Sequence, residues 1–364
     1  MIASSRPDTA DAKPAGRAAR TRAARTRATR AVRAALVAGV TALAVVTSPA
    51  VSPTPAVASS VPAAESLPAV ASLPAAASPV ETGLSAGVVV ENWRGYSGPF
   101  RKTHDLNRIV VVSARGATDG KALKLQLDAH PGTGPRMGVE IASNNPAFRY
   151  GTFGSRMKTA NCAGQVRPGV VTGTFTASMD HSDANANGLP DNDEIDIEVL
   201  CAQPEVIWMS IWTDYDELTE TPRKISRAVD LRTGQVIYNC YLMTWTGSCE
   251  PLMVGEDSPA TLAPVPAFNS ATQFHSYWFR WQPNRIRFYA TGSSDAPILL
   301  WDYQGPVSRI PQKTAMFLQN VWHTDSWDPF NGRARNVPTR ATAAYLDSST
   351  VPLWTTAPWP PVEP

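Results

Sequence analysis

The chain has 364 residues, of which 43% are hydrophobic and 18% are charged, enough for one large domain or two small ones. Its first 80 residues hold nine of the 32 prolines but no tryptophan, tyrosine, phenylalanine or cysteine. A segment without bulky side chains cannot build a packed core, because too little apolar burial is available to offset chain entropy. The composition therefore excludes a uniformly folded chain, a tandem-repeat array and a disulfide-dense miniprotein.

The positive charge of the chain is concentrated in the same segment. Nine of the 33 Lys and Arg residues but only three of the 31 Asp and Glu residues lie within residues 1–80. The remainder has 24 basic and 28 acidic residues, a net charge of −4. A mildly acidic body offers no electrostatic footprint for phosphate backbones, so we expect no nucleic-acid partner.

Residues 1–58 are predicted to be a secretory signal segment. The apolar run from Ala34 to Thr47 directly follows an arginine-rich stretch, and its 14 residues are too few to span a bilayer as a helix. Ala56-Val57-Ala58 provides the small residues of a cleavage site. The alternative is an amphipathic or nucleic-acid-binding arm. The signal interpretation predicts a secreted, extracellular protein without membrane attachment after cleavage.

The residues after the signal segment divide into a linker and a folded body. Residues 59–80 are rich in Ala, Pro and Ser, which predicts an extended linker, and residues 81–364 form the predicted domain. In an oxidising compartment the four cysteines predict two disulfides. Three connectivities are possible. Cys240 and Cys249 flank a short hairpin pattern, which favours a bridge between them and, by elimination, one between Cys162 and Cys201.

The body has the pattern of an all-β domain. Short alternating segments are separated by Gly, Pro, Asn and Asp, and no helical period is sustained. About a dozen strands in one domain predict a two-sheet antiparallel β-sandwich of the jelly-roll type. The clearest predicted strands are Val88–Asn92, Arg108–Ser113, Leu123–Asp128, Gly169–Ser178, Glu194–Cys201, Val206–Thr213, Lys224–Asp230, His275–Trp281, Arg285–Ala290 and Thr314–His323.

One of these strands carries aromatic side chains on both faces. Strand alternation places His275, Tyr277, Phe279 and Trp281 on one face, and Ser276, Trp278 and Arg280 on the other. A strand of this kind is expected to be covered on one side and to line something on the other.

The segment Glu194-Ile195-Asp196-Ile197-Glu198 places three carboxylates on one face of a strand. Like charges in a row repel one another, so the pattern brings no structural gain. The α-carbons of Glu194 and Glu198 are expected about 13 Å apart. Side chains that lean toward a substrate can close their separation to about 5–5.5 Å, the spacing of retaining glycosidases. The alternative is a half-exposed strand with a solvated acidic face.

Other motifs surround the acidic strand in a specific order. They are Tyr150–Lys158 (YGTFGSRMK) and Gly169–Phe175 (GVVTGTF) before it, and Phe274–Pro283 (FHSYWFRWQP) and Asn320-Val321-Trp322 after it. With the acidic strand, this set resembles glycoside hydrolase family 16, the concanavalin A-like jelly rolls that include lichenases, laminarinases and xyloglucan endotransglycosylases. The resemblance covers about Val88 to Leu353.

The resemblance implies a role for several residues. Glu194 would be the nucleophile, Asp196 its helper and Glu198 the acid/base. The residues that would bind substrate are Glu140, Trp212, Asn320 and Trp322. It implies a monomeric retaining endo-β-glycosidase that acts on a β-glucan-type polysaccharide and needs no cofactor for catalysis. The alternatives are a transglycosylase on wall glucans and a non-catalytic carbohydrate-binding β-sandwich.

A loop just before the acidic strand fits the pattern of a calcium-binding loop, D-x-[DN]-x-[DN]-G-x5-E. The twelfth ligand of that pattern would be Glu194, which a bound cation would make a poorer nucleophile. A shorter ligand set leaves Glu194 unbound and consists of Asp183, Asn185, Asn187 and Asp191. A structural calcium ion is one interpretation, and a metal-free turn rich in Asn and Asp is the other.

Overall fold

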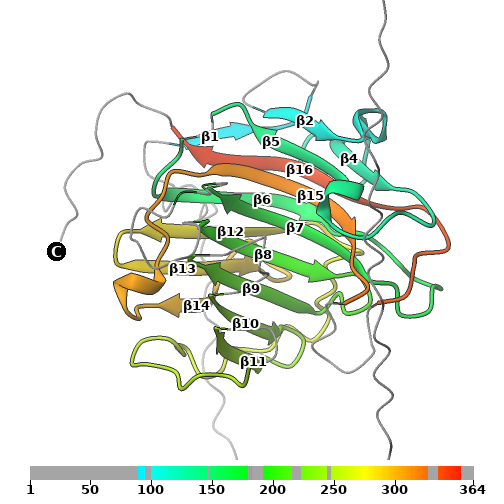
Figure 1. Ribbon diagram of the computed structural model, residues 1–364. Helices are drawn as coiled ribbons and strands as arrows, with labels where there is room; N and C mark the ends of the chain where they lie inside the picture. Colours follow the sequence, from blue (N-terminus) through cyan, green and yellow to red (C-terminus); the bar gives the residue numbers. More distant parts are fainter. Residues whose placement is uncertain are drawn as a thin grey trace, which may run out of the picture. The chain divides into compact units, whose positions relative to one another are not determined.

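The protein was analysed as a computed structural model (Figure 1). The structure describes residues 88–94, 100–145, 147–178, 180, 182, 192–214, 223–243, 247–326 and 335–353. The predicted signal segment and linker, residues 1–80, lie outside the described residues.

The described residues form two antiparallel sheets that lie as two layers (Figure 1). The sheet that we call the β12 sheet has the order β14-β13-β12-β6-β16-β4-β3, and β1 pairs with β16. Its strands are β1 (Val88–Glu91), β3 (Ile109–Ser113), β4 (Lys121–Leu127), β6 (Gly151–Lys158), β12 (His275–Gln282), β13 (Arg285–Thr291), β14 (Pro297–Tyr303) and β16 (Thr342–Pro352).

The sheet that we call the β8 sheet has the order β11-β10-β9-β8-β7-β15-β5-β2. Its strands are β2 (Phe100–His104), β5 (Val139–Ser143), β7 (Val170–Ala177), β8 (Glu194–Leu200), β9 (Val206–Trp212), β10 (Lys224–Asp230), β11 (Gln235–Leu242) and β15 (Met316–His323). Three short 3-10 helices complete the described elements: Leu106–Arg108, Pro135–Met137 and Val307–Arg309. No helix in these parts of the chain is long and apolar enough to cross a membrane. The predicted two-sheet antiparallel β-sandwich is confirmed.

The core lies between the two sheets because each strand turns alternate side chains inward. On β8 the inward residues Ile195 and Ile197 are completely buried. On the facing sheet, Phe153 of β6 is also completely buried, and its ring centroid lies 5.7 Å from that of Phe317 on β15. Burial of each such side chain stabilises the fold by about 1.5–3 kcal/mol. The apolar half of the acidic strand therefore holds the layers together and leaves its acidic half on the other face.

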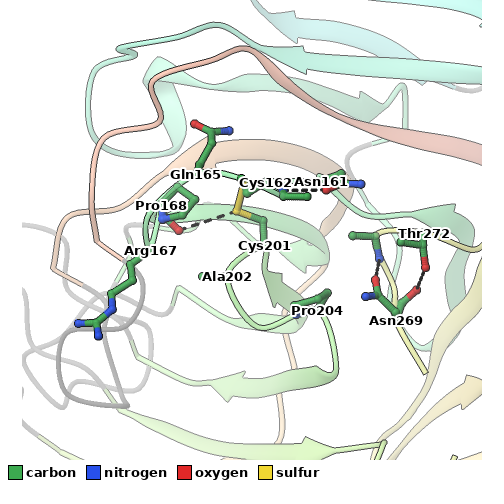
Figure 2. Close-up of a pocket in the computed structure, with 13 residues that line it drawn as sticks. Asn161, Cys162, Gln165, Arg167, Pro168, Cys201, Ala202, Pro204, Asn269 and Thr272 are labelled. Carbon is green, nitrogen blue, oxygen red and sulfur yellow. Dashed lines mark hydrogen bonds between the residues drawn. A yellow bond between two sulfur atoms is a disulfide. The ribbon is translucent and has the colours of Figure 1, made fainter. Parts of the chain in front are cut away.

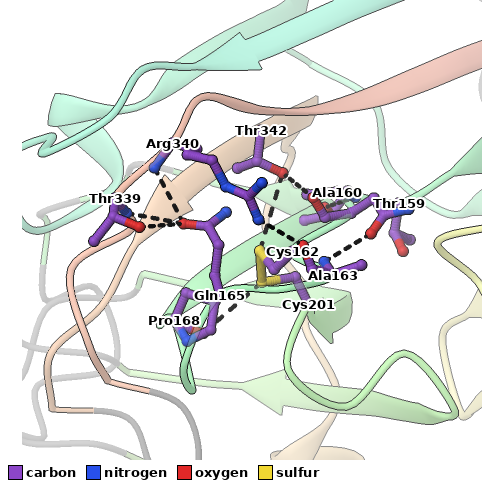
Figure 3. Close-up of a disulfide and its surroundings, with 12 residues drawn as sticks. Thr159, Ala160, Cys162, Ala163, Gln165, Pro168, Cys201, Thr339, Arg340 and Thr342 are labelled. Atoms are coloured by element: carbon purple, nitrogen blue, oxygen red, sulfur yellow. Dashed lines mark hydrogen bonds between the residues drawn. A yellow bond between two sulfur atoms is a disulfide. The ribbon is translucent and has the colours of Figure 1, made fainter.

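Both predicted disulfides are confirmed, Cys162–Cys201 and Cys240–Cys249. The first joins the connection after β6 to the turn that follows β8, so it anchors the end of the acidic strand (Figure 3). The same connection is held on its other side, because Gln165 Oε1 accepts hydrogen bonds from the backbone N–H groups of Thr339 at 2.8 Å and Arg340 at 3.2 Å.

Candidate active site

The three predicted carboxylates of β8 lie together on the face of the β8 sheet that points away from the core. Glu194 and Glu198 are half-buried, and Asp196 between them is 2% exposed. Strand β8 lies inside the sheet, between β7 and β9, and its register places Asp196 opposite Phe175 on one side and Ser210 on the other. Neighbouring strands on both sides therefore remove water from the carboxylates.

Trp212 of β9 contacts this row directly. It pairs in register with Glu194, and its indole Nε1–H donates a hydrogen bond of 2.6 Å to Asp196 Oδ2. The predicted substrate-binding tryptophan is thus also a hydrogen-bond donor to the central carboxylate. This bond orients Asp196 between the two glutamates.

Lys224, at the start of β10, is a site residue that the sequence did not single out. It pairs in register with Trp212, and its Nζ lies 4.2 Å from the centroid of the Trp212 ring, a cation–π contact. Its charge also acts on all three carboxylates of β8. The side chain is only 9% exposed, so a buried cation faces the acidic row.

On the β7 side of Glu198, Asn320 and Glu140 lie in register with it on the strands further along the sheet. Glu198 pairs with Gly173 of β7, Gly173 with Asn320 of β15, and Asn320 with Glu140 of β5. Gly173 leaves the space that Asn320 occupies, because an added Cβ would lie 2.7 Å from Asn320 Oδ1. The structure therefore places these two predicted substrate-binding residues in one row with Glu198.

Glu140 and Asn320 are held by hydrogen bonds. Asn320 Nδ2 donates to Glu140 Oε2 at 3.4 Å, and the Thr103 hydroxyl donates to Glu140 Oε1 at 2.8 Å. Glu140 is 5% exposed and Asn320 2% exposed. Asn320 Oδ1 is buried without a hydrogen-bond partner among the described residues. That atom is a natural acceptor for a hydroxyl of a bound ligand.

An aromatic patch adjoins Glu198 on the same face, formed by Trp208, Tyr238 and Trp322. Trp208 pairs in register with Glu198, and its ring centroid lies 5.2 Å from that of Tyr238. Trp322 is hydrogen-bonded to Glu198. Under these rings lies a small apolar cluster: Val171, Leu200, Val206 and Ala228. The acid/base candidate thus has an apolar, aromatic neighbour surface.

Burial and mutual repulsion shift the proton affinities of this row. Burial, helped by the charge of Glu198, raises the pKa of Glu194 from 4.5 to about 7, while its hydrogen bond with Asp196 opposes the shift. Burial and the charge of Asp196 raise the pKa of Glu198 to about 8. Burial likewise raises the pKa of Asp196, and it lowers the pKa of Lys224. The folded environment therefore favours the protonated forms of the three carboxyl groups and the neutral form of Lys224.

The four predicted calcium ligands lie outside the described residues. They are Asp183, Asn185, Asn187 and Asp191. The described end of this loop is anchored by Asp193, whose Oδ2 accepts hydrogen bonds from the backbone N–H groups of Gln312 at 2.6 Å and Lys313 at 3.1 Å. Within the described ranges, no three or more His, Cys, Asp and Glu side chains form a group that could hold a metal ion.

A cavity of about 460 Å³ lies beside the Cys162–Cys201 disulfide (Figure 2). Amide and small side chains line it, and Arg167 is the charged residue among them. It has no carboxylate in its lining, so it lacks the acid chemistry of the β8 row. The cavity and the candidate active site are different places on the molecule.

The fold and the row of carboxylates on β8 were compared with those of known proteins, because paired carboxyl groups are the catalytic groups of most glycosidases. Residues 105–248 match the model of the family described as glycosyl hydrolases family 16. The matched segment includes Glu140, Trp212 and the three carboxylates of β8. Asn320 and Trp322 lie beyond it.

Searches against known proteins gave the following further results. No curated protein matches the sequence. Among solved structures, the chain is similar to a Bacillus licheniformis beta-glucanase, with 19% identity, a TM-score of 0.45, and coverage of 73% of this chain and 98% of that one. It is also similar to a prokaryotic β-1,3-1,4-glucanase (lichenase) from a mouse hindgut metagenome, with 21% identity, a TM-score of 0.40, and coverage of 73% and 92%. A third similar structure is the Crh5 transglycosylase in complex with NAG, with 16% identity, a TM-score of 0.45, and coverage of 75% and 87%.

Proposed function

We propose that the protein is a secreted retaining endo-β-glycosidase that hydrolyses a β-glucan-type polysaccharide. The observation that carries the proposal is the row of three carboxylates on one face of β8, in which Glu194 and Glu198 flank Asp196. Glu194 serves as nucleophile, because its hydrogen bond with Asp196 and the charge of Lys224 both favour its ionised form. Glu198, with a pKa of about 8, holds its proton and serves as acid.

In the first step, Glu198 donates its proton to the glycosidic oxygen while Glu194 attacks the anomeric carbon. The carbon–oxygen bond to the leaving sugar breaks, and an ester bond to Glu194 forms. In the second step, ionised Glu198 takes a proton from water, the water oxygen attacks the same carbon, and the ester bond breaks. Both steps use the same two side chains, and neither requires a cofactor.

The residues around the carboxylates have supporting roles in this mechanism. Asp196, oriented by Trp212, hydrogen-bonds to Glu194 and keeps the nucleophile in place. The Glu140–Asn320 pair offers buried polar atoms to sugar hydroxyls, and Trp322 offers an indole beside Glu198. Alternating polar and flat apolar groups suit a sugar chain, which has hydroxyl edges and apolar ring faces.

The test is the release of reducing ends from barley β-glucan, laminarin, xyloglucan, chitin oligomers and agarose. Wild type is compared with Glu194→Gln, which keeps the size of the side chain and removes the nucleophile. We expect activity on a β-glucan in wild type and its loss in the variant, with the variant's melting temperature showing that it is folded. Activity that survives the substitution, or no activity on any of these polymers, contradicts the proposal. Binding without turnover would favour the non-catalytic alternative.

The aromatic patch favours one second candidate function, transglycosylation. It adjoins Glu198, the group that faces the leaving sugar and later activates the attacking nucleophile. The partly exposed rings of Tyr238 and Trp322, which pack against buried Trp208, are suited to hold an acceptor sugar, whose hydroxyl would replace water in the second step. The test adds a fluorescent β-gluco-oligosaccharide as acceptor. Labelled products longer than the acceptor indicate transfer, and label that stays in the original oligosaccharide indicates hydrolysis alone.

The secretion part of the proposal rests on the basic-then-apolar order of residues 17–47 and on the two disulfides, which are typical of oxidising compartments. Expression of the full chain in a secreting host, followed by mass spectrometry of the protein in the medium, tests it. We expect a new N-terminus close to Ala58. Full-length protein retained in the cells would contradict it.

A further inference from the structure

Strand β2 departs from regular pairing at the point where it meets Glu140. It is an edge strand of the β8 sheet, and its neighbour is β5 (Figure 1). Lys102 of β2 pairs with Ile141 of β5. The next pair joins His104 to Glu140, so Thr103 is an extra residue in β2. A bulge of this kind re-aims side chains and is over-represented next to active sites. Here it brings two consecutive side chains of β2 to one carboxylate.

Both of these side chains contact Oε1 of Glu140. The Thr103 hydroxyl donates a hydrogen bond of 2.8 Å to it, and His104 Nδ1 lies 3.3 Å from it. That nitrogen is buried and makes no aligned hydrogen bond among the described residues, while the His104 side chain as a whole is 36% exposed. Contacts at an unliganded site are often long or poorly aligned and tighten when substrate binds. The contact is favourable when Nδ1 carries its hydrogen, because an ionised carboxylate can only accept.

The other oxygen of the same carboxylate is held from the opposite side. Asn320 Nδ2 donates to Glu140 Oε2 at 3.4 Å, so β2 holds one oxygen and β15 holds the other. A carboxylate has about four acceptor sites, so these contacts fix its orientation and leave room for the hydroxyl of a ligand. Because Glu140 is only 5% exposed, burial would disfavour its charge if these donors were absent.

The position of Glu140 in the sheet separates it from the reacting bond. It lies in the same register row as Glu198, but β7 and β15 stand between their strands. Three strand spacings put the two backbones about 14 Å apart. At that distance Glu140 can hold a sugar unit away from the cleaved bond, and it cannot take part in proton transfer. A group that fixes Glu140 should therefore change substrate binding and leave the chemical step alone.

From these observations we infer that His104 is a positioning residue, which together with Thr103 fixes the carboxylate of Glu140 for a hydroxyl of a sugar unit remote from the cleaved bond. The inference rests on the proposed function, since it takes Glu140 as a substrate-binding residue. The bulge makes the arrangement possible, because regular alternation would turn one of two consecutive side chains to the opposite face. A carboxylate that is already oriented loses less conformational freedom when the sugar binds, so affinity rises.

The experiment measures binding and turnover separately. Binding is the retardation of the full chain in native gels that contain barley β-glucan or laminarin, with Glu194→Gln in every protein so that the polymer stays intact. Turnover is measured by reducing ends without that substitution. The test variant is His104→Ala. His104→Asn and His104→Gln form a matched pair, because the amide nitrogen of Asn lies near the place of Nδ1 and that of Gln near the place of Nε2. Asp105→Asn is the control, since the carboxylate of Asp105 faces Arg108 at 4.0 Å.

We expect His104→Ala and His104→Gln to raise the dissociation constant and KM about tenfold and to leave kcat within about twofold of wild type. His104→Asn and Asp105→Asn should bind as wild type does. A merely structural role for His104 would affect the Asn and Gln variants equally, and that result would overturn the inference.

An unchanged dissociation constant in His104→Ala, a fall in kcat alone, or no retardation by either polymer would overturn the inference as well. Melting temperatures show that the variants are folded. The proposed function fails by a different result, which is a wild type that binds a polymer without hydrolysing it. In that case the dissociation constants of the His104 variants still decide the inference, because the gels measure binding without turnover.

Discussion

The two faces that the sandwich turns away from its core carry opposite charges in a similar arrangement. On the β8 sheet, Glu194 and Glu198 flank a third carboxylate beside Trp212. On the β12 sheet, Arg280 and Arg287 lie opposite each other, beside a stacked aromatic pair. Both arrangements place like charges at neighbouring positions, which by itself costs stability.

The two faces differ in what their charged groups can do. The carboxylates are desolvated enough that their pKa values move toward neutrality, so they can give and take protons. Arginine keeps its proton throughout the physiological range, so the charge of Arg280 and Arg287 on the opposite face is fixed. Like charges that lie together can therefore change their protonation on one sheet and keep a fixed charge on the other.

Removal of the acid on the β8 face should have the largest effect. Glu198→Ala should lower the rate on a β-glucan by about 10³-fold, because the leaving oxygen loses its proton donor. An aryl glycoside, whose leaving group needs no proton, should be affected much less in the first step. Azide should rescue the second step by attacking the anomeric carbon, which releases Glu194 and yields a β-glycosyl azide.

The matched control for this prediction comes from the other face. Arg280→Gln with Arg287→Gln should hydrolyse the same β-glucan at the wild-type rate, as measured by reducing ends. An equal loss on both substrates in Glu198→Ala, or formation of the α-azide, would contradict the assignment of Glu198. A loss of hydrolysis in the arginine variant would contradict the separation of the two faces.

Opening the disulfide that anchors β8 should have the next largest effect. Cys162→Ser with Cys201→Ser opens a loop with a sequence separation of 39 and should reduce the free energy of unfolding by about 4 kcal/mol. Cys240→Ser with Cys249→Ser opens a loop with a sequence separation of 9 and should reduce the free energy of unfolding by about 2.5 kcal/mol. Denaturant unfolding measures both losses. If the Cys240→Ser with Cys249→Ser variant lost more stability than the other, the explanation from loop-closure entropy would be contradicted.

The acidic face should respond to pH within a narrow window. Glu194 must be ionised and Glu198 protonated, so kcat/KM should fall below pH of about 7 and again above about 8. Lys224 favours the ionised form of Glu194. Lys224→Met should therefore raise the pKa of Glu194 and shift the acidic side of the pH profile of kcat/KM to higher pH. At pH 6, kcat/KM should fall by about tenfold.

Lys224→Arg is the control, because it keeps the charge over Trp212. The Lys224→Arg variant should keep the acidic side of the pH profile of kcat/KM where wild type has it. If Lys224 had only a structural role, Lys224→Met would lower activity equally at every pH and would not shift the acidic side of the pH profile. That outcome would contradict its assignment as a residue that sets the charge of the β8 row.

Glu194→Gln should make the protein slightly more stable at alkaline pH. The folded state raises the pKa of Glu194 from 4.5 to about 7, so the folded state holds this proton more tightly than the unfolded state does. That carboxyl therefore costs stability as pH rises through this window, and the cost is complete above about 7. We expect the variant to be more stable than wild type at pH 8, by no more than roughly 3 kcal/mol, and equal to it at pH 4. Thermal melting at the two pH values checks this, and a difference that does not change with pH would contradict it.

Calcium removal should have the smallest effect. We propose that Asp183, Asn185, Asn187 and Asp191 hold a structural calcium ion in the loop before β8. A chelator should then lower the melting temperature by about 2–4 °C, and added calcium should restore it. Asp183→Asn should remove this dependence. An unchanged midpoint in wild type would exclude calcium and leave a turn without metal.

Much of the fold and of the site follows from local patterns in the sequence. The alternation of Glu194 to Glu198 places three carboxylates on one face wherever the strand lies, and burial of Ile195 and Ile197 confirms it. The close spacing of Cys240 and Cys249 likewise limits their pairing. These predictions hold because side-chain alternation and short loop closure are properties of the local backbone.

Other features depended on which strand lies beside which. Lys224 begins a strand with no local mark of function, and it reaches the carboxylates only because β10 pairs with β9 in a register that sets it against Trp212. Arg287 meets Arg280 for the same reason, through the register of β12 and β13. The sequence by itself thus determined the faces of the strands, the acidic row and the aromatic strand. The tertiary structure decided their neighbours, because strand order and register are set by long-range hydrogen bonds and by packing of the whole core.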